Sequence, residues 1–292
     1  MQRFYGVVFG CALMCAAGLA VTAAPERQAP LSVAAAPVLQ GQWFRPTVGM
    51  SWQWQLLVND EHPLNTGYAV EIYNLDLFNT SASTISALQA SGHRVICYFS
   101  AGTYENYSED RHQFASHDLG AVVAGWPQER WLDIRSPAVQ STMISRLDLA
   151  ERKGCDAVEP DNVQGYLEDT GFPLSAEDQL AYNRFIANEA HRRKLGVGLK
   201  NALEQVGELV AYFDFSINEQ CFQYNECQQL MPFIEAGKPV LNAEYPEDQQ
   251  QPAINARAAA SLCEAANELG FSTLILPVEL DDSFRVSCQS QH

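Results

Sequence analysis

Short apolar segments alternate along the chain with longer segments in which apolar residues recur every three or four positions. The short segments have the length and composition of buried strands, and the longer ones have the period of amphipathic helices. This pattern predicts strands over residues 69–75, 94–102, 130–134, 155–162, 196–201, 215–220, 239–245 and 272–280. Repeated strand–helix units on this scale predict an α/β fold, the (β/α)8 or TIM barrel.

Residues that begin and end helices support this reading. Ser136 and Pro137 suit the N-cap and first position of a helix that Gly154 ends, and Ser175 with Asp178 has the spacing of a capping box.

A doubly wound open sheet is the alternative fold, but no glycine-rich phosphate turn follows the first strand. Residues 50–57 precede that strand without an intervening helix. We interpret them as an extra segment packed near the rim of the barrel.

The N-terminus has the layout of a secretory signal peptide. Arg3 precedes a long apolar stretch, and small residues surround a cleavage position after Ala23. We assign residues 1–23 to the signal peptide, 24–46 to a flexible tether and 47–292 to one barrel domain. No later segment is apolar enough to span a bilayer, so we expect a secreted or periplasmic protein without an integral membrane domain.

The cysteines fit an exported protein. Six follow the predicted signal peptide, and an even number in such a protein favours disulfides. Two pairs are expected, Cys221 with Cys227 and Cys263 with Cys288. Cys97 and Cys155 lie in predicted strands and are interpreted as buried thiols. The residues before Cys11 and Cys15 match a lipobox poorly, so lipid anchoring is the less favoured alternative.

The formal net charge of −17 argues against nucleic acid as a partner and suits a cationic ligand. Solubility alone is the other explanation of this charge. No cysteine or histidine spacing indicates a zinc site, and we expect neither a metal nor another cofactor. We also expect a monomer.

Polar side chains gather where the predicted strands end. In a TIM barrel these ends form one mouth, which is where the active site lies. The residues at strand ends are Asp76, Asp133, Glu159, Asp161, Lys200, Asn201, Glu219, Glu244 and Glu279. Acids at the ends of several strands are difficult to explain as solvation alone.

The segment GCDAVEPDNVQGY, residues 154–166, places three acids in a strand that otherwise reads as buried. Side chains alternate along a strand, so Glu159 and Asp161 point the same way and Asp156 lies near the opposite end. We expect Asp156 to be structural, with a partner on a helix. Glu159 lies deeper than Asp161, with Lys200 as its expected partner. The alternation also argues against a metal site formed by the three acids.

Two carboxylates that flank a cavity are the minimum for glycoside hydrolysis. Asp161 faces the predicted cavity, and Glu219, two strands away, can reach the same space. Flat faces for sugar rings are expected from Trp52, Trp54, Tyr98 and Tyr104, although packing explains such aromatics equally well. The chain has no GxSxG sequence, and its histidines lie away from strand ends, which disfavours catalysis by serine or histidine.

Between about residues 50 and 246 the chain resembles the endo-α-1,4-polygalactosaminidase family, glycoside hydrolase family 114. The matching stretches are SWQWQL, YNLDLFNT, VICYFSAGTYENY, WLDIRS, KGCDAVEPDNVQGY, TGFPLSAEDQLAYNR, VGLKN, FDFSINEQCFQY and AGKPVLNAEY. Residues 247–292 show less of the pattern.

The resemblance implies a secreted TIM-barrel hydrolase that cleaves α-1,4-linked galactosamine polymers internally. Its catalytic carboxylates correspond to Asp161 in EPDN and Glu219 in NEQC. Analogy with retaining α-galactosidase-like barrels makes Asp161 the nucleophile and Glu219 the general acid/base, and the reverse assignment stays open.

A deacetylated galactosamine polymer is polycationic, which gives the acidic charge a use. Substrate contacts are expected from Trp52, Trp54, Tyr98, Asp133, Glu159, Lys200, Asn201 and Glu244. Two alternatives remain. One is a retaining α-glycosidase acting on another sugar, such as α-galactosides, and the other is a non-catalytic polysaccharide-binding matrix protein with the same barrel.

Overall fold

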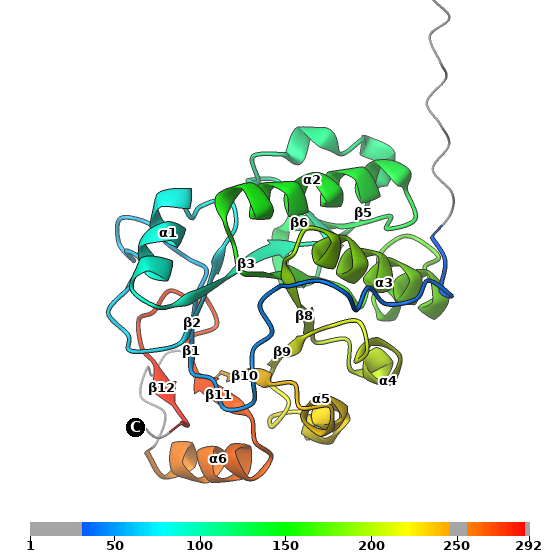
Figure 1. Ribbon diagram of the computed structural model, residues 1–292. Helices are drawn as coiled ribbons and strands as arrows, with labels where there is room; N and C mark the ends of the chain where they lie inside the picture. The colour runs from blue at the N-terminus through cyan, green and yellow to red at the C-terminus, as the bar shows by residue number, and fades with distance from the viewer. Residues whose placement is uncertain (1–30, 246–255, 290–292) are drawn as a thin grey trace, which may run out of the picture.

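Within the residues that the computed structural model describes, 31–245 and 256–289, nine strands form one main sheet (Figure 1). Its strands in spatial order are β1 (Trp52–Gln55), β2 (Ile72–Asp76), β3 (Arg94–Ser100), β7 (Ala157–Asp161), β8 (Gly196–Lys200), β9 (Phe215–Glu219), β10 (Val240–Glu244), β11 (Ser272–Ile275) and β12 (Val286–Ser287). Neighbouring strands are parallel from β1 to β11, and β12 is antiparallel to β11.

Helices lie around the outside of this sheet (Figure 1). They are α1 (Ala82–Ala90), α2 (Pro137–Lys153), α3 (Ala176–Arg192), α4 (Val206–Leu209), α5 (Met231–Glu235) and α6 (Ala256–Glu268). Side chains also join the two ends of the sheet, because Trp52 Nε1 donates to the Ser272 carbonyl at 2.8 Å and Arg285 Nη2 donates to the Trp52 carbonyl at 2.8 Å. The mixed α/β class is confirmed, and the curled sheet is consistent with a TIM-like barrel.

Two strand assignments from the sequence are wrong. Residues 50–57 are not an extra segment, because β1 pairs with β2 inside the main sheet. The interpretation as an extra segment rests on the absence of a helix before the next strand, but Gln53 and Gln55 are fully buried and their amides donate to Asp282 and to the Pro63 carbonyl.

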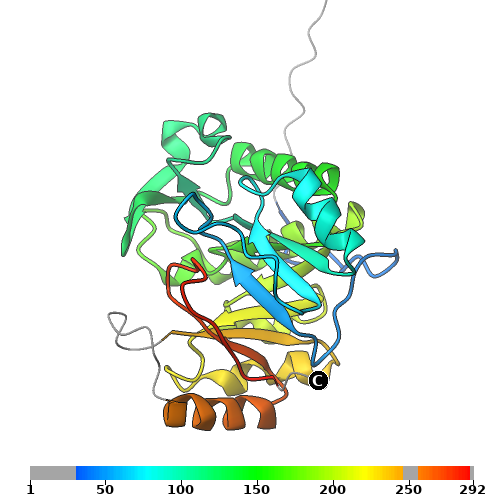
Figure 2. The ribbon, with the colours of Figure 1, turned by 90° about the vertical axis from the view of Figure 1, so that its left-hand side faces the viewer.

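The predicted strand 130–134 lies outside the main sheet. It belongs to β6 (Trp126–Leu132), which pairs antiparallel with β4 (Thr103–Glu105) and β5 (Leu119–Val123). Figure 2 shows this small sheet beyond the carboxyl ends of the main strands. The main sheet gains β1 and loses the strand predicted at 130–134. As predicted, β7 and β9 are therefore its fourth and sixth strands.

The local signals for the helices are confirmed. Gly154 adopts a left-handed φ of +84° where α2 ends, and Pro137 is its first residue. Ser175 and Asp178 form the reciprocal capping box of α3.

Three disulfides are present among the described residues. The expected pairs Cys221–Cys227 and Cys263–Cys288 are confirmed. Cys97 and Cys155 are not free thiols, because they form the third disulfide. The strand predicted at 130–134 would have stood between the strands that contain these two cysteines. Because that strand lies outside the main sheet, β3 and β7 are direct neighbours. Disulfides at this density are typical of an oxidising compartment.

Part of the predicted tether is packed on the domain. The Trp43 ring stacks on His191 at 4.1 Å between centroids, and its Nε1 donates to Asp214. The predicted signal peptide, residues 1–23, and residues 24–30 of the predicted tether lie outside the described residues. No described helix is long and apolar enough to cross a membrane.

Candidate active site

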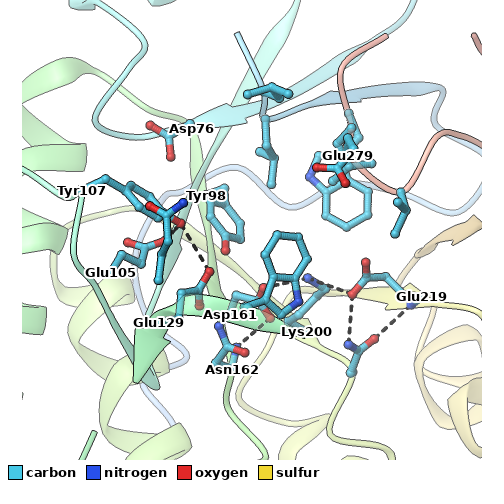
Figure 3. A pocket seen from close by; sticks show the side chains of 18 of the residues that line it. Asp76, Tyr98, Glu105, Tyr107, Glu129, Asp161, Asn162, Lys200, Glu219 and Glu279 are labelled. Atoms are coloured by element: carbon cyan, nitrogen blue, oxygen red, sulfur yellow. Dashed lines mark hydrogen bonds and ion pairs between the residues drawn. The ribbon is translucent and has the colours of Figure 1, made fainter. Parts of the chain in front are cut away.

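A cavity of about 530 Å³ opens at the carboxyl ends of the parallel strands (Figure 3). Its lining includes the last residues of three main-sheet strands, Asp161 of β7, Lys200 of β8 and Glu219 of β9. Among the described lining residues there are six carboxylic acids and one cation, Lys200. This surplus of acid distinguishes the cavity from an ordinary polar cleft.

Lys200 lies between the two predicted catalytic carboxylates. Its side chain is only 2% exposed, and Nζ lies 3.0 Å from Asp161 Oδ2, 3.2 Å from Glu219 Oε2 and 3.4 Å from Glu159 Oε1. The two oxygens on Asp161 and Glu219 are therefore no more than about 6.2 Å apart. We call these four residues the lysine cluster.

Charge and burial compete within the lysine cluster. Burial alone would raise the pKa of Glu219, but the Lys200 ammonium and hydrogen bonds from Tyr245 and Asn201 hold it below the usual value. Burial raises the pKa of Glu159 to about 8, against the opposing effect of Lys200. Burial would lower the pKa of Lys200, but its three carboxylate neighbours raise it. Glu159 is therefore mostly protonated at neutral pH, and Lys200 stays charged.

The residues that follow these strands adopt an uncommon backbone. The backbone is left-handed at Asn162, Asn201 and Gln220, with φ values of +60°, +47° and +61°. Residues other than glycine rarely adopt this conformation. The turn at Asn201 has a visible use, because its Oδ1 accepts from the Glu219 backbone N–H at 2.9 Å and its Nδ2 contacts Glu219 Oε2 at 3.3 Å. Strain of this kind often marks functional sites.

A second group of residues lines the cavity from the small sheet. Glu105 of β4 lies opposite Glu129 of β6 in the strand register, and the Tyr107 hydroxyl lies 3.2 Å from Glu105 Oε1 and 3.3 Å from Glu129 Oε1. Trp126 begins β6 and also lines the cavity. We call Glu105, Tyr107, Trp126 and Glu129 the side wall.

Burial also shifts the acids here. It raises the pKa of Glu129 to about 7, with Glu105 adding to the effect, and it raises the pKa of Asp76 on β2 to about 6. The pKa of Glu105 is raised for the same reason. Glu129 and Asp76 are consequently poised to change protonation near neutral pH.

Gly102 allows the side wall to approach the lysine cluster. A side chain at this position would place its Cβ 1.8 Å from the backbone oxygen of Asn162, the residue that follows Asp161. The chain can therefore turn from β3 into β4 directly beside β7.

Sequence reasoning missed the side wall. Residues 103–127 showed only a weak helical pattern, and their partner strand had been placed in the barrel. The available signal was the run TYENY, residues 103–107, in which two tyrosines flank Glu105 and Asn106. Tyr104, expected at the site, instead packs edge-on against Phe114, and Tyr107 lines the cavity.

The predicted substrate contacts divide into two groups. Trp54, Tyr98, Lys200 and Asn201 line the cavity, and Glu159 lies beneath it, with Asn74 Nδ2 donating to its Oε2 at 2.5 Å. Asp76 and Glu279, also noted at strand ends, line it as well.

The other three predicted contacts have different surroundings. Trp52 is buried in the core and donates to the Ser272 carbonyl. Both oxygens of Asp133 accept from Arg135, at 2.8 and 2.9 Å. Glu244 accepts from the Phe222 backbone N–H and the Asn242 amide. None of the three lines the cavity.

Asp156 has the structural role expected of it. It accepts hydrogen bonds from Gln89 of α1 and from the Val95 backbone, and it forms an ion pair with Arg94 at 2.8 Å.

Comparison with known proteins decides the family. The family model described as glycoside-hydrolase family GH114 matches residues 33–292. The chain belongs to this family. The crystal structure of Aspergillus fumigatus Ega3 in complex with galactosamine shares 40% identity and a TM-score of 0.79, over 85% of this chain and 99% of that one. No curated protein matches the chain.

A similar fold, at lower sequence identity, occurs in the glycoside hydrolase domain of PelA from Pseudomonas aeruginosa. It has a TM-score of 0.63 at 15% identity, over 81% of this chain and 98% of that domain. Identity this low shows a shared fold only. The GH114 match makes the present protein a glycoside hydrolase, and the resemblance found in the sequence is confirmed.

Proposed function

We propose that this GH114 enzyme is a secreted endo-acting hydrolase that cleaves α-1,4-linked galactosamine polymers, with Asp161 and Glu219 as its catalytic pair. The observation that most favours the pair is their common contact with Lys200 at 3.0 and 3.2 Å. Two carboxylates from different strands thereby face one space that is large enough for a sugar ring.

The spacing of the pair favours retention of configuration. Retaining glycosidases hold their two carboxyl groups roughly 5–5.5 Å apart, and inverting enzymes hold them roughly 6.5–9.5 Å apart to admit a water molecule. The facing oxygens of Asp161 and Glu219 lie within about 6.2 Å of each other, below the inverting range.

In the proposed reaction Asp161 attacks the anomeric carbon while Glu219 protonates the departing glycosidic oxygen. Water then cleaves the glycosyl–Asp161 ester, with Glu219 as the general base that takes up its proton. Lys200 limits the charge repulsion between the two carboxylates. The same contact keeps Glu219 ionised in the substrate-free protein, so its acid form requires acidic conditions or a change on substrate binding.

The choice of galactosamine as substrate rests on two observations. The similar protein Ega3 was crystallised with galactosamine. Among the described residues, the cavity lining also has six acids against one cation, which suits an ammonium-bearing sugar better than a neutral one.

The test is the release of reducing ends from polygalactosamine by the purified protein. The Asp161→Asn variant should lose this activity and still bind the polymer, because the substitution keeps the size of the side chain. Release from neutral α-galactosides alone would indicate a different sugar specificity. Polymer binding by the parent protein without release would indicate a matrix-binding protein.

A further inference from the structure

Among the described residues, Glu105 and Glu129 of the side wall form no ion pair, because no cation lies within 4.0 Å of their carboxylates, and the same is true of Asp76. Burial raises the pKa of Glu105 and the charge of Arg146 lowers it, but Arg146 forms its own ion pair with Asp110 at 2.8 Å. Lys200, the one cation that the described part of the chain contributes to the cavity lining, already contacts three acids of the lysine cluster.

Hydrogen bonding in the side wall is also incomplete. The Tyr107 hydroxyl has one proton but lies near two carboxylate oxygens, at 3.2 and 3.3 Å, which is longer than usual for an O–H donor. Ser108 and Thr103 donate to the other oxygens of Glu105 and Glu129. An additional donor between Glu105 Oε1 and Glu129 Oε1 would complete the set, and an ammonium group supplies up to three N–H donors.

Two aromatic side chains of the side wall remain exposed. Trp126 is 50% exposed and Tyr107 is 57% exposed, although both line the cavity. Large exposed aromatic surfaces in a groove mark ligand-binding positions more often than packing. A sugar ring has the flat apolar face and the polar edge that such a surface beside two carboxylates can bind.

The side wall lies away from the acid/base position. In Figure 3, Glu105, Tyr107 and Glu129 lie on one side of Asp161, whereas Glu219 lies on the other. Asp161 also contributes to the raised pKa of Glu129, which is consistent with their proximity. A chain with one linkage between Asp161 and Glu219 can therefore extend toward the side wall.

We propose that the side wall is a binding subsite for a deacetylated galactosamine residue of the chain, whose ring stacks on Trp126 and whose ammonium group binds Glu105 and Glu129. This inference rests on the proposed function and adds the residues that distinguish an amino sugar from its N-acetylated form. An acetamido group has no positive charge and only one N–H, so it cannot bind both carboxylates in the same way.

The test compares Trp126→Ala and Glu129→Gln with the parent on deacetylated and on N-acetylated galactosamine polymer. For Trp126→Ala we expect KM for the deacetylated polymer to rise about tenfold or more, equivalent to about 1.4 kcal/mol of binding. For Glu129→Gln we expect the ratio of kcat/KM between the two polymers to fall about tenfold, because the charge that favours the ammonium is removed.

Two matched variants control for general effects. Val122→Ala removes an apolar side chain that is 57% exposed on the same small sheet but does not line the cavity. Glu151→Gln removes an acid on the outer helix α2. Both should keep the KM and the polymer preference of the parent. Thermal unfolding of all four variants shows that each is folded at the assay temperature.

The outcomes separate this proposal from the proposed function. If the parent cleaves the polymer and Trp126→Ala and Glu129→Gln match it in KM and in preference, the subsite is refuted while the enzyme stands. If the parent releases no reducing ends, the proposed function is refuted. In that case calorimetric titration with deacetylated galactosamine oligomers tests the subsite. If the subsite exists, Trp126→Ala and Glu129→Gln should both bind these oligomers more weakly than the parent, and unchanged affinity in both would refute it.

Discussion

Replacing Lys200 by methionine tests whether the lysine cluster is held by charge. The methionine side chain is close in length to lysine and resembles its apolar aliphatic part, but it lacks the ammonium group. The substitution leaves Asp161 and Glu219 facing each other in a buried site where their shared cation, at 3.0 and 3.2 Å, is absent. It tests the inference that one ammonium allows two acids to share this space.

The expected loss of stability at neutral pH is large. Removing one partner of a buried ion pair costs about 3–5 kcal/mol, because the remaining charge is buried without compensation. For a domain of this size about 1 kcal/mol corresponds to roughly 2–4 °C in Tm, so Tm should fall by about 6–20 °C.

The loss should depend on pH. In the parent, Lys200 lowers the pKa of Glu219 below its unfolded value, so this interaction stabilises the fold above that value and is lost as pH falls through the lowered pKa. Without Lys200, burial and the neighbouring Asp161 should raise the pKa of Glu219 above its unfolded value. The variant then loses stability as pH rises through the raised pKa, and its deficit should be greatest near pH 7.5.

Thermal unfolding of both proteins at about pH 4.5 and 7.5 measures this difference. Lys153→Met is the matched control, because Lys153 donates to the carbonyls of Leu77, Phe78 and Thr80 and forms no ion pair within 4.0 Å among the described residues. Its Tm loss should change less with pH than that of Lys200→Met, because Lys153 acts on Asp76 and Glu109 only through charge at distances beyond 4.0 Å. If the loss in Lys200→Met changed no more with pH than the loss in this control, the electrostatic account of the cluster would be refuted.

Three further outcomes are expected. The variants Asp161→Gly and Glu219→Gly should each lose about 10²–10⁴-fold in rate. Added azide should then give the β-glycosyl azide with Asp161→Gly and the α-glycosyl azide with Glu219→Gly, as identified by NMR. The opposite pair of products would reverse the roles of the two residues. If Glu219 is the acid, kcat/KM should fall as pH rises from below its ordinary pKa of 4.5, and a constant value to pH 7 would contradict this. Replacing Cys97 and Cys155 by alanine should cost about 2–5 kcal/mol, and an unchanged Tm would count against a structural disulfide.

Features that depend on neighbouring residues could be predicted from the sequence. The boundaries of α2 follow from Pro137 at its first position and Gly154 at its end, and the start of α3 follows from a capping box within one turn. Ser136 occupies the N-cap position of α2 without a side-chain hydrogen bond. The alternation along β7 correctly separates Asp156 from Glu159 and Asp161. The placement of acids at strand ends also depends only on local order and on the general geometry of parallel βα units.

Features that depend on strand pairing could not be predicted in this way. The sequence places residues 50–57 outside the sheet because no helix separates them from the next strand, whereas β1 pairs directly with β2. The buried Gln53 donates to Asp282, which is far away in sequence. The link between Cys97 and Cys155 required that β3 and β7 be neighbours, which the misplacement of residues 130–134 had hidden.

The sequence by itself determined the family, the alternation of strands and helices, and Asp161 and Glu219 as the expected acids. Only the tertiary structure decided that Lys200 contacts both of them and that Glu105 and Glu129 of a separate small sheet complete the cavity wall. The physical reason is that local patterns specify only which way a side chain points from its own element. The distance between charges on different strands depends on how the sheet curls and on how closely a loop can approach it, as the chain does at Gly102 beside Asn162.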